Sequence, residues 1–129
     1  MTPKALSQVL ALDAATCVAV FALGVFATAT VAELTGLPGQ IAAAGGWICL
    51  AAAALLAYLA VRPSRGLLWL TIAGNVGWVA ASLAVWLAYF DSLTPLGHAI
   101  VLAQAAGVAL FVMLESRGAR SITGRQAIA

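Results

Sequence analysis

Four long apolar segments, separated by short polar turns, dominate the pattern of hydrophobic and polar positions along the chain. They predict helices at about residues 5–31, 40–61, 67–90 and 95–116, each able to cross roughly 30 Å of hydrocarbon at about 1.5 Å per residue. The turns at 33–39, 62–66 and 91–95 are rich in glycine, proline and polar residues. Transmembrane β-strands would instead be segments of about 10 residues with alternating polarity. The pattern therefore predicts an all-α membrane protein, a single up-down-up-down bundle of four transmembrane helices over residues 1–129.

Composition supports lipid as the main solvent of this chain. It is 64% hydrophobic and 8% charged, whereas an ordinary soluble domain has about 25% charged residues. So few charges cannot cover a surface that faces water. The first apolar run is longer than the core of a signal peptide, so we interpret it as a retained helix. We expect the polar residues 117–129 to form a flexible tail.

The charged residues indicate the orientation in the membrane. With four spans, all basic residues lie on one side of the membrane, and the only charged residues in the turns on the opposite side are Glu33 and Asp91. The basic residues are Lys4, Arg62, Arg65, Arg117, Arg120 and Arg125. The positive-inside rule then predicts a multi-pass protein of the cell inner (cytoplasmic) membrane with both termini in the cytoplasm. Glu115, near the same side, is expected to pair with Arg62, Arg65 or Arg117. The basic residues are too few and too scattered to bind nucleic acid.

The two predicted helical hairpins resemble each other weakly. Each has an acidic residue, threonine, proline and glycine around its outer turn, and each ends in Ser-Arg-Gly, at 64–66 and 116–118. This fits two similar hairpins repeated about an axis along the membrane normal. Turns and membrane ends favour the same residues without any repeat, so both interpretations stay open.

Asp13 is the most informative polar residue inside a predicted span. It lies about 10 Å from the cytoplasmic end of the first helix by helix rise, and Thr16 follows it on the same face. An aspartate at a helix centre costs roughly 2.5–3.5 kcal/mol on insertion scales, so it should face protein or water and find a partner. Asp13 either binds a ligand or a coupling proton, or it fixes helix packing through hydrogen bonds.

Three more residues lie at depths that allow them to join Asp13. Asn75 and Trp78 belong to the third predicted helix, and Gln104 belongs to the fourth. If these side chains converge with Asp13 and Thr16 in the cytoplasmic half of the bundle, they form a polar binding site for a small ligand. The alternative is interhelical hydrogen bonding alone, worth about 0.6 kcal/mol per contact on average in one membrane host.

Small residues predict where helices approach each other closely. Ala42, Gly46, Gly74 and Gly77 lie within the second and third predicted helices. Such residues let backbones come near each other. The contacts can be within one chain or between copies, and the sequence does not distinguish the two.

We expect no metal site, although three residues are candidates. His98 is the only histidine, and a haem held across a homodimer axis would need two copies of it. Cys17 and Cys49 fall at similar depth if the first two helices are neighbours. They are expected to pack as small apolar residues, with a disulfide or a soft-metal pair as the alternative. The identity of any cofactor stays unknown.

The chain resembles a loose set of small bacterial four-helix integral membrane proteins with no assigned activity. The resemblance rests on Asn-Val-Gly-Trp at 75–78, Leu-Thr-Pro-Leu-Gly at 93–97 and Leu-Glu-Ser-Arg-Gly at 114–118, and it covers most of the chain. It implies the same fold and brings no function. Small multidrug-resistance transporters are similar in helix number and in a first-helix carboxylate. This chain departs from them in having Asp13 rather than a glutamate and a strongly biased topology, so we do not assign it there.

These observations lead to three functional hypotheses. The sequence has no nucleophile–histidine–acid set, phosphate loop or HExxH motif, so we expect no enzyme. The first hypothesis is a non-enzymatic bundle that binds a lipophilic small ligand or a partner membrane protein. We expect such a bundle to be a homo-oligomer or to associate with another membrane protein. The second is a small proton-coupled transporter or channel that uses Asp13, with Asn75 and Gln104 contacting substrate. The third is a haem-binding membrane protein that uses His98.

Overall fold

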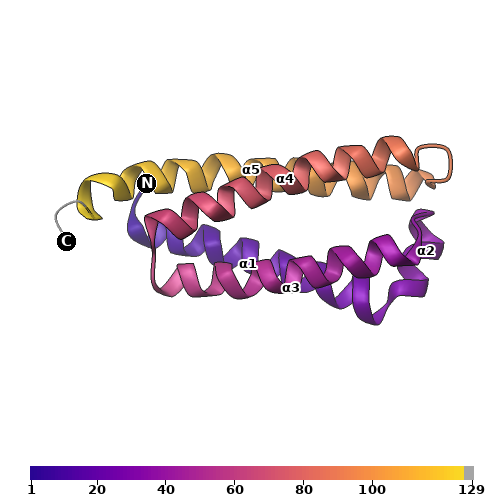
Figure 1. Cartoon of the computed structure of the whole chain (residues 1–129), viewed down its shortest axis with the longest axis horizontal. Coiled ribbons are helices and arrows are strands. Elements are labelled where there is room, and N and C mark those ends of the chain that lie inside the picture. Colours follow the sequence, from indigo (N-terminus) through magenta and orange to yellow (C-terminus); the bar gives the residue numbers. More distant parts are fainter. Residues whose placement is uncertain (127–129) are drawn as a thin grey trace.

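The computed structural model describes the backbone of residues 1–126 and the side chains of residues 1–122. The described part is all helical, and four of its five helices are long and apolar enough to cross a membrane (Figure 1). The helices are α1 (Pro3–Phe26), α2 (Thr28–Thr35), α3 (Gly39–Val61), α4 (Arg65–Ala88) and α5 (Pro95–Gln126). The predicted all-α fold with four transmembrane helices is therefore confirmed.

The first predicted helix, 5–31, is two helices in the structure. Helix α1 ends at Phe26, Ala27 leaves helical geometry with φ −121° and ψ 32°, and α2 continues from Thr28. The hydroxyl of Thr28 donates to the carbonyl oxygens of Gly24 at 2.6 Å and Val25 at 3.1 Å. Hydroxyl bonds of this kind to the preceding turn can bend a helix, and here they accompany the departure of Ala27 from helical geometry. No proline marks the break, so the sequence pattern did not show it.

The last helix is longer than predicted. Helix α5 runs to Gln126 instead of ending at about residue 116, so residues 117–126 are helical where a flexible tail was expected. The extra turns begin with a tertiary contact, because Ala119 is fully buried and Gly118 packs against the side chain of Leu6. Packing of this kind stabilises a helix that propensity alone leaves marginal. Residues 127–129 of the expected tail lie outside the described residues.

The helices form two hairpins that lie as two layers. Helices α1 and α3 pack closely in one layer and α4 and α5 in the other, while few contacts join α3 to α4 (Figure 1). Close packing of α1 on α3 depends on glycine: a Cβ on Gly24 would meet the carbonyl oxygen of Ala42, and one on Gly46 would lie 3.0 Å from Val25. Ala42 and Gly46 thus act within one chain. A Cβ on Gly74 or Gly77 would meet nothing within 4 Å.

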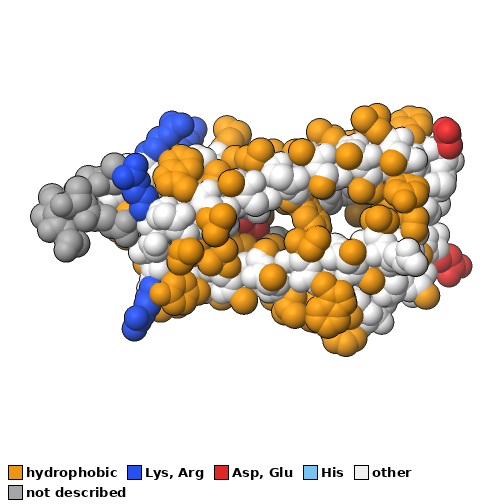
Figure 2. All heavy atoms as spheres, viewed as in Figure 1, with side chains coloured by type: hydrophobic (Ala, Val, Ile, Leu, Met, Phe, Trp, Pro, Cys, Tyr) orange, Lys and Arg blue, Asp and Glu red, His pale blue; other side chains and the backbone are white. Residues whose placement is uncertain are grey.

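The two hairpins are joined at both ends of the bundle. One end, here called the basic end, carries the lysine and arginine side chains that the structure describes (Figure 2). They are Lys4, Arg62, Arg65, Arg117 and Arg120. This end has a buried cluster contributed by α1, α3, α4 and α5. The cluster consists of Leu6, Leu10, Ala14, Leu56, Leu59, Leu68, Ile72 and Ala119.

The opposite end carries Glu33 and Asp91 and is here called the acidic end (Figure 2). There the Thr94 amide donates to the Thr35 carbonyl at 3.0 Å and the Thr94 hydroxyl to the Leu34 carbonyl at 2.6 Å. Gly36 adopts φ +80° beside Ser92, a conformation that favours glycine. The two layers are thus joined at both ends, and a space remains between them in the middle of the bundle. The similarity of the two hairpins stays a prediction, although the first contains a helix break and α2 while the second is a plain hairpin.

The glycine contact between α1 and α3 generates a stability prediction. Gly24→Ala places a methyl group against the backbone of Ala42, which cannot move away as a flexible side chain would. We expect the free energy of unfolding to fall by about 1–3 kcal/mol, the usual cost of overpacking. Gly77→Ala is the matched control, since its Cβ meets open space and alanine favours the helix. Detergent or thermal unfolding of purified protein measures both, and equal stability of the two variants would contradict the proposed packing.

Candidate functional site

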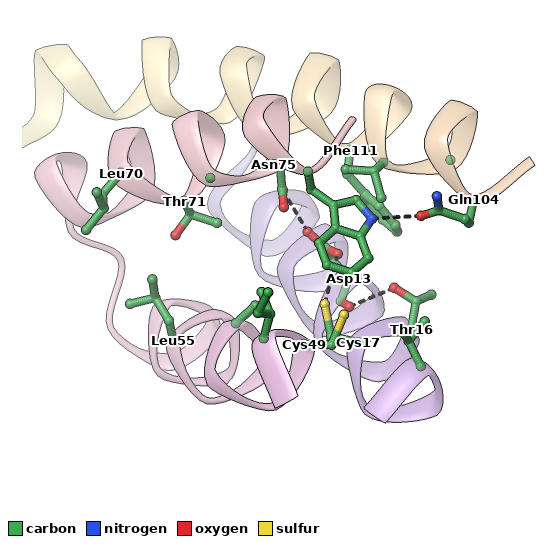
Figure 3. Close-up of a pocket in the computed structure, with 17 residues that line it drawn as sticks. Asp13, Thr16, Cys17, Cys49, Leu55, Leu70, Thr71, Asn75, Gln104 and Phe111 are labelled. Carbon is green, nitrogen blue, oxygen red and sulfur yellow. Dashed lines mark hydrogen bonds between the residues drawn. The ribbon is translucent and has the colours of Figure 1, made fainter. Parts of the chain in front are cut away.

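A cavity of about 450 Å³ lies between the two hairpins, between the basic end and the acidic end of the bundle. Residues of α1, α3, α4 and α5 all contribute to its wall (Figure 3). The volume falls within the roughly 300–1,000 Å³ typical of small-molecule sites. Figure 2 shows the hollow between the layers, with acidic side-chain atoms visible inside it. The molecule therefore has an internal space large enough for an organic ligand.

All five residues that the sequence predicted as a ligand site line this cavity. They are Asp13, Thr16, Asn75, Trp78 and Gln104. Helical depth placed them at a common level, and the packing of the hairpins brings them together. Their role in binding stays a prediction, but their convergence on one cavity is a property of the fold.

Asp13, Asn75 and Glu115 form a buried hydrogen-bonded group, here called the carboxyl cluster. The Nδ2 atom of Asn75 donates to Asp13 Oδ2 at 3.2 Å and to Glu115 Oε2 at 3.0 Å. Asp13 is 2% exposed and Glu115 is fully buried. The cluster joins α1, α4 and α5, so one amide connects the two hairpins near the centre of the bundle. Asp13 borders the cavity, whereas Glu115 is not part of its lining.

The sequence-based placement of Glu115 was wrong. We expected it at the membrane interface beside an arginine, but it is fully buried and accepts its hydrogen bond from Asn75. The physical reason is the length of α5: the helix continues to Gln126, so Glu115 is an interior residue and not part of the last turn. A signal was available, because Glu115 is on the same helical face as Gln104, three turns away.

A second polar network fixes the aromatic wall of the cavity. The indole nitrogen of Trp78 donates to Gln104 Oε1 at 2.7 Å, and Gln104 Nε2 donates to Ser82 Oγ at 2.9 Å and to the Val101 carbonyl at 3.0 Å. The Ser82 hydroxyl donates back to the carbonyl of Trp78 at 2.8 Å. The amide donors of Gln104 are thereby used within the protein. The bond from Trp78 to Gln104 holds the Trp78 ring in place. Thr16, on α1, is outside this network and donates its hydroxyl to the Asp13 carbonyl at 2.8 Å.

The two cysteines meet beside Asp13. Cys17 and Cys49 are both free thiols that line the cavity, and their side chains are in contact (Figure 3). The Cys17 sulfur lies 3.8 Å from Asp13 Oδ1 as a weak donor. The structure thus confirms that the first two spans are neighbours at this depth. Over the described residues, no group of three His, Cys, Asp or Glu side chains could hold a metal ion.

His98 is remote from the cavity and has its own partners. Its Nδ1 accepts a hydrogen bond from the indole nitrogen of Trp86 at 2.9 Å, and its ring packs against Phe90 with centroids 4.7 Å apart. A neutral imidazole has a single ring-nitrogen lone pair, which here is engaged by Trp86. A haem iron would have to displace that bond.

The chemistry of the cavity favours a particular kind of ligand. Most of the wall is apolar, with Ile48, Leu55, Leu70 and Phe111 among its residues. Asp13 supplies a carboxylate, and within the described lining there is no lysine, arginine or histidine. Aromatic faces attract cations as well as apolar groups. The cavity therefore suits a lipophilic molecule that carries a positive charge or a strong hydrogen-bond donor.

The bridging amide of Asn75 can be tested by its effect on stability. Asn75→Leu removes the donor shared by two buried carboxyl groups, and leaving such groups unsatisfied costs about 1–3 kcal/mol each. We expect a loss of unfolding free energy of at least about 1 kcal/mol. Val76→Leu, at an exposed apolar position one residue away, is the control. If both variants unfold alike in a detergent titration, the hydrogen bonds of Asn75 contribute nothing to the bundle.

Comparison with known proteins assigns no family to this chain. It matches no protein-family model, no curated protein and no solved structure. The resemblance to small bacterial four-helix membrane proteins therefore stays a prediction, and any function proposed for the chain depends on the geometry and chemistry of its cavity.

Proposed function

We propose that this protein is a non-enzymatic membrane bundle that binds a lipophilic small molecule with a positive charge or a strong hydrogen-bond donor. One observation carries the proposal: the carboxylate of Asp13 borders an apolar cavity of about 450 Å³ at the middle of a membrane-spanning bundle. A carboxylate in hydrocarbon is costly unless it has a compensating partner. A bound cation supplies that partner and at the same time buries its own apolar surface against the wall.

The packing of the helices supports a route for such a ligand. Both ends of the bundle are closed, at the basic end by the buried cluster and at the acidic end by the Thr94 hydrogen bonds. Helices α3 and α4 make few contacts, and the hollow in Figure 2 lies between the two layers. We propose that a ligand dissolved in the lipid enters sideways between α3 and α4. Ile48 and Leu70, which flank this opening, are more than half exposed, as lipid-facing residues are.

The charge distribution supports an orientation for the bundle. The basic end carries all the lysine and arginine side chains of the described part, and the acidic end carries Glu33 and Asp91. By the positive-inside rule, we propose that the basic end and both termini face the cytoplasm, as in a protein of the inner membrane. The carboxyl cluster then lies in the cytoplasmic half. Association with further copies or with a partner membrane protein is proposed only on the basis of the sequence.

Proton-coupled transport is the second candidate function, and the carboxyl cluster favours it. A coupling site needs a carboxyl group that the substrate and a proton can both reach, and Asp13 borders the cavity while touching a second carboxyl group. Transport further requires the site to open alternately to both sides of the membrane. Binding and flux in proteoliposomes are separate measurements, so the two functions can be told apart.

The charge preference of the cavity can be tested with a pair of probes of equal shape. Tetraphenylphosphonium and tetraphenylborate are both lipophilic and carry opposite charges. We expect purified protein in detergent micelles to quench or shift its tryptophan fluorescence on binding the cation in preference to the anion, because Trp78 and Asp13 share the cavity. Asp13→Asn should weaken binding of the cation by about tenfold or more, which corresponds to about 1.4 kcal/mol.

Asp91→Asn is the matched control for this experiment, since it makes the same change at the acidic end, away from the cavity. We expect it to bind the cation as the parent protein does. The proposal fails if the parent protein shows no saturable binding of the cation. It also fails if the anion binds as tightly as the cation and Asp13→Asn has no effect.

The cavity itself can be filled without disturbing the packing around it. Gly107 lines the cavity and a Cβ there meets nothing within 4 Å, so Gly107→Leu should place its side chain in the ligand space. We expect cation binding to fall by about tenfold or more while the helix is retained, since leucine favours helix over glycine. Gly77→Leu adds the same side chain at an open position outside the lining. Equal binding by the two variants would place the ligand elsewhere.

A further inference from the structure

We infer that Asp13 and Glu115 share a single proton, and that a cation entering the cavity takes the place of this proton. The second half of the inference rests on the proposed function, whereas the shared proton does not. Glu115 is the starting point, because it is a fully buried acid outside the cavity lining that the binding proposal leaves without a role.

The hydrogen-bonding of Glu115 requires one more donor than the ionised cluster contains. Asn75 Nδ2 satisfies Oε2 at 3.0 Å, but Oε1 is buried with no hydrogen-bond partner. The carboxyl groups of Asp13 and Glu115 also lie side by side on the same amide, within reach of a hydrogen bond to each other. Ionised carboxylates are acceptors only, so two of them cannot form such a bond. One proton on the pair supplies the missing donor and turns the contact between the acids into a hydrogen bond.

The charges around the pair lead to the same result. From α1 the neighbouring titratable group is Cys17, from α3 it is Cys49, and α4 contributes the neutral Asn75. These groups bring no positive charge. The basic side chains that the structure describes are exposed at the basic end of the bundle, and none of them borders the cavity. Two adjacent negative charges without a cation in a low-dielectric interior are strongly unfavourable, and a proton removes one of them.

The positions of the two acids divide their roles. Asp13 borders the cavity and can touch a ligand, whereas Glu115 is reached only through Asp13 and Asn75. With the proton present, the pair has a net charge of −1. When a monovalent cation binds beside Asp13, it replaces the proton as the compensating positive charge, and the proton leaves to solvent. The sum of charges on both sides of this exchange is unchanged. Glu115 thus acts on the ligand through Asp13, as a positioning residue.

Proton release on binding is the direct test. We add tetraphenylphosphonium to the full-length protein in weakly buffered detergent solution with a pH indicator, and measure binding in parallel. About one proton should be released for each cation bound, and the apparent affinity should rise by up to about tenfold per pH unit in the range where the pair is protonated. Cation binding with no proton release at any pH would overturn the inference and leave the proposed function standing.

Glu115→Gln and Glu33→Gln form a matched pair of variants. The glutamine amide at 115 supplies the missing donor without a titratable proton, so the number of protons released per bound cation should fall to near zero. This ratio does not depend on how tightly the cation binds. Glu33→Gln makes the same change at the acidic end and should keep the ratio at about one. Undiminished release from Glu115→Gln would overturn the assignment.

An infrared spectrum tests the shared proton without any ligand. A buried protonated carboxyl group has a C=O stretching band separate from that of carboxylates, and we expect such a band at neutral pH in the parent protein and not in Glu115→Gln. If no cation binds, the proposed function fails and this band still decides whether the proton is present. A band of equal intensity in both proteins would contradict the shared proton.

Discussion

Hydrocarbon offers no hydrogen bond to a polar group, and both the helical spans and the polar networks inside the bundle follow from that constraint. Backbone groups must be satisfied within each crossing segment, which is why the spans are helices. Polar side chains in the spans must likewise find partners inside the protein. Trp78, Ser82 and Gln104 do so through a short series of bonds between α4 and α5. The carboxyl cluster extends the same solution to α1.

The cavity lies between two hairpins that are tight within themselves and are joined to each other at both ends and, beside the cavity, by the carboxyl cluster. Gly24 and Gly46 bring α1 against α3, and the buried cluster and the Thr94 hydrogen bonds close the two ends. Between them the layers diverge, and Gly74 and Gly107 leave the inner faces bare where larger residues would fill the space. An apolar gap of this kind in a soluble protein would be destabilising, since cavities forfeit packing contacts. In a membrane, lipid or a ligand can occupy it.

The site is unusual in its balance of charge. Two acids and one amide meet in the interior, while the basic residues described by the structure remain at one end of the bundle. In a soluble protein, water or a nearby arginine would compensate such a pair. In the function proposed above, the compensating charges are a proton and a ligand, and the two would compete for Asp13. That competition connects the binding proposal with the coupled-transport alternative, because both depend on the same carboxyl group.

The sequence by itself determined that the helices are suited to lipid, how many of them span the membrane, and which end of the bundle is basic and which is acidic. These properties depend on the summed transfer free energy of about 20 residues at a time and on flanking charges, which are local quantities. It also determined the depths of Asp13, Asn75 and Gln104, because helix rise is constant. Depth alone left open whether these residues meet and whether they surround a space.

Only the tertiary structure decided those questions. The break at Ala27 is accompanied by a threonine hydroxyl that bonds to carbonyls of the preceding turn, and the extra turns of α5 begin with the packing of Ala119 among other helices. The length of α5 in turn made Glu115 an interior acid and not an interfacial one. Which helices are neighbours, and how far apart they lie, depends on many contacts between segments that are distant in the sequence. Local composition does not contain this information. The cavity and the carboxyl cluster both result from that arrangement of the helices.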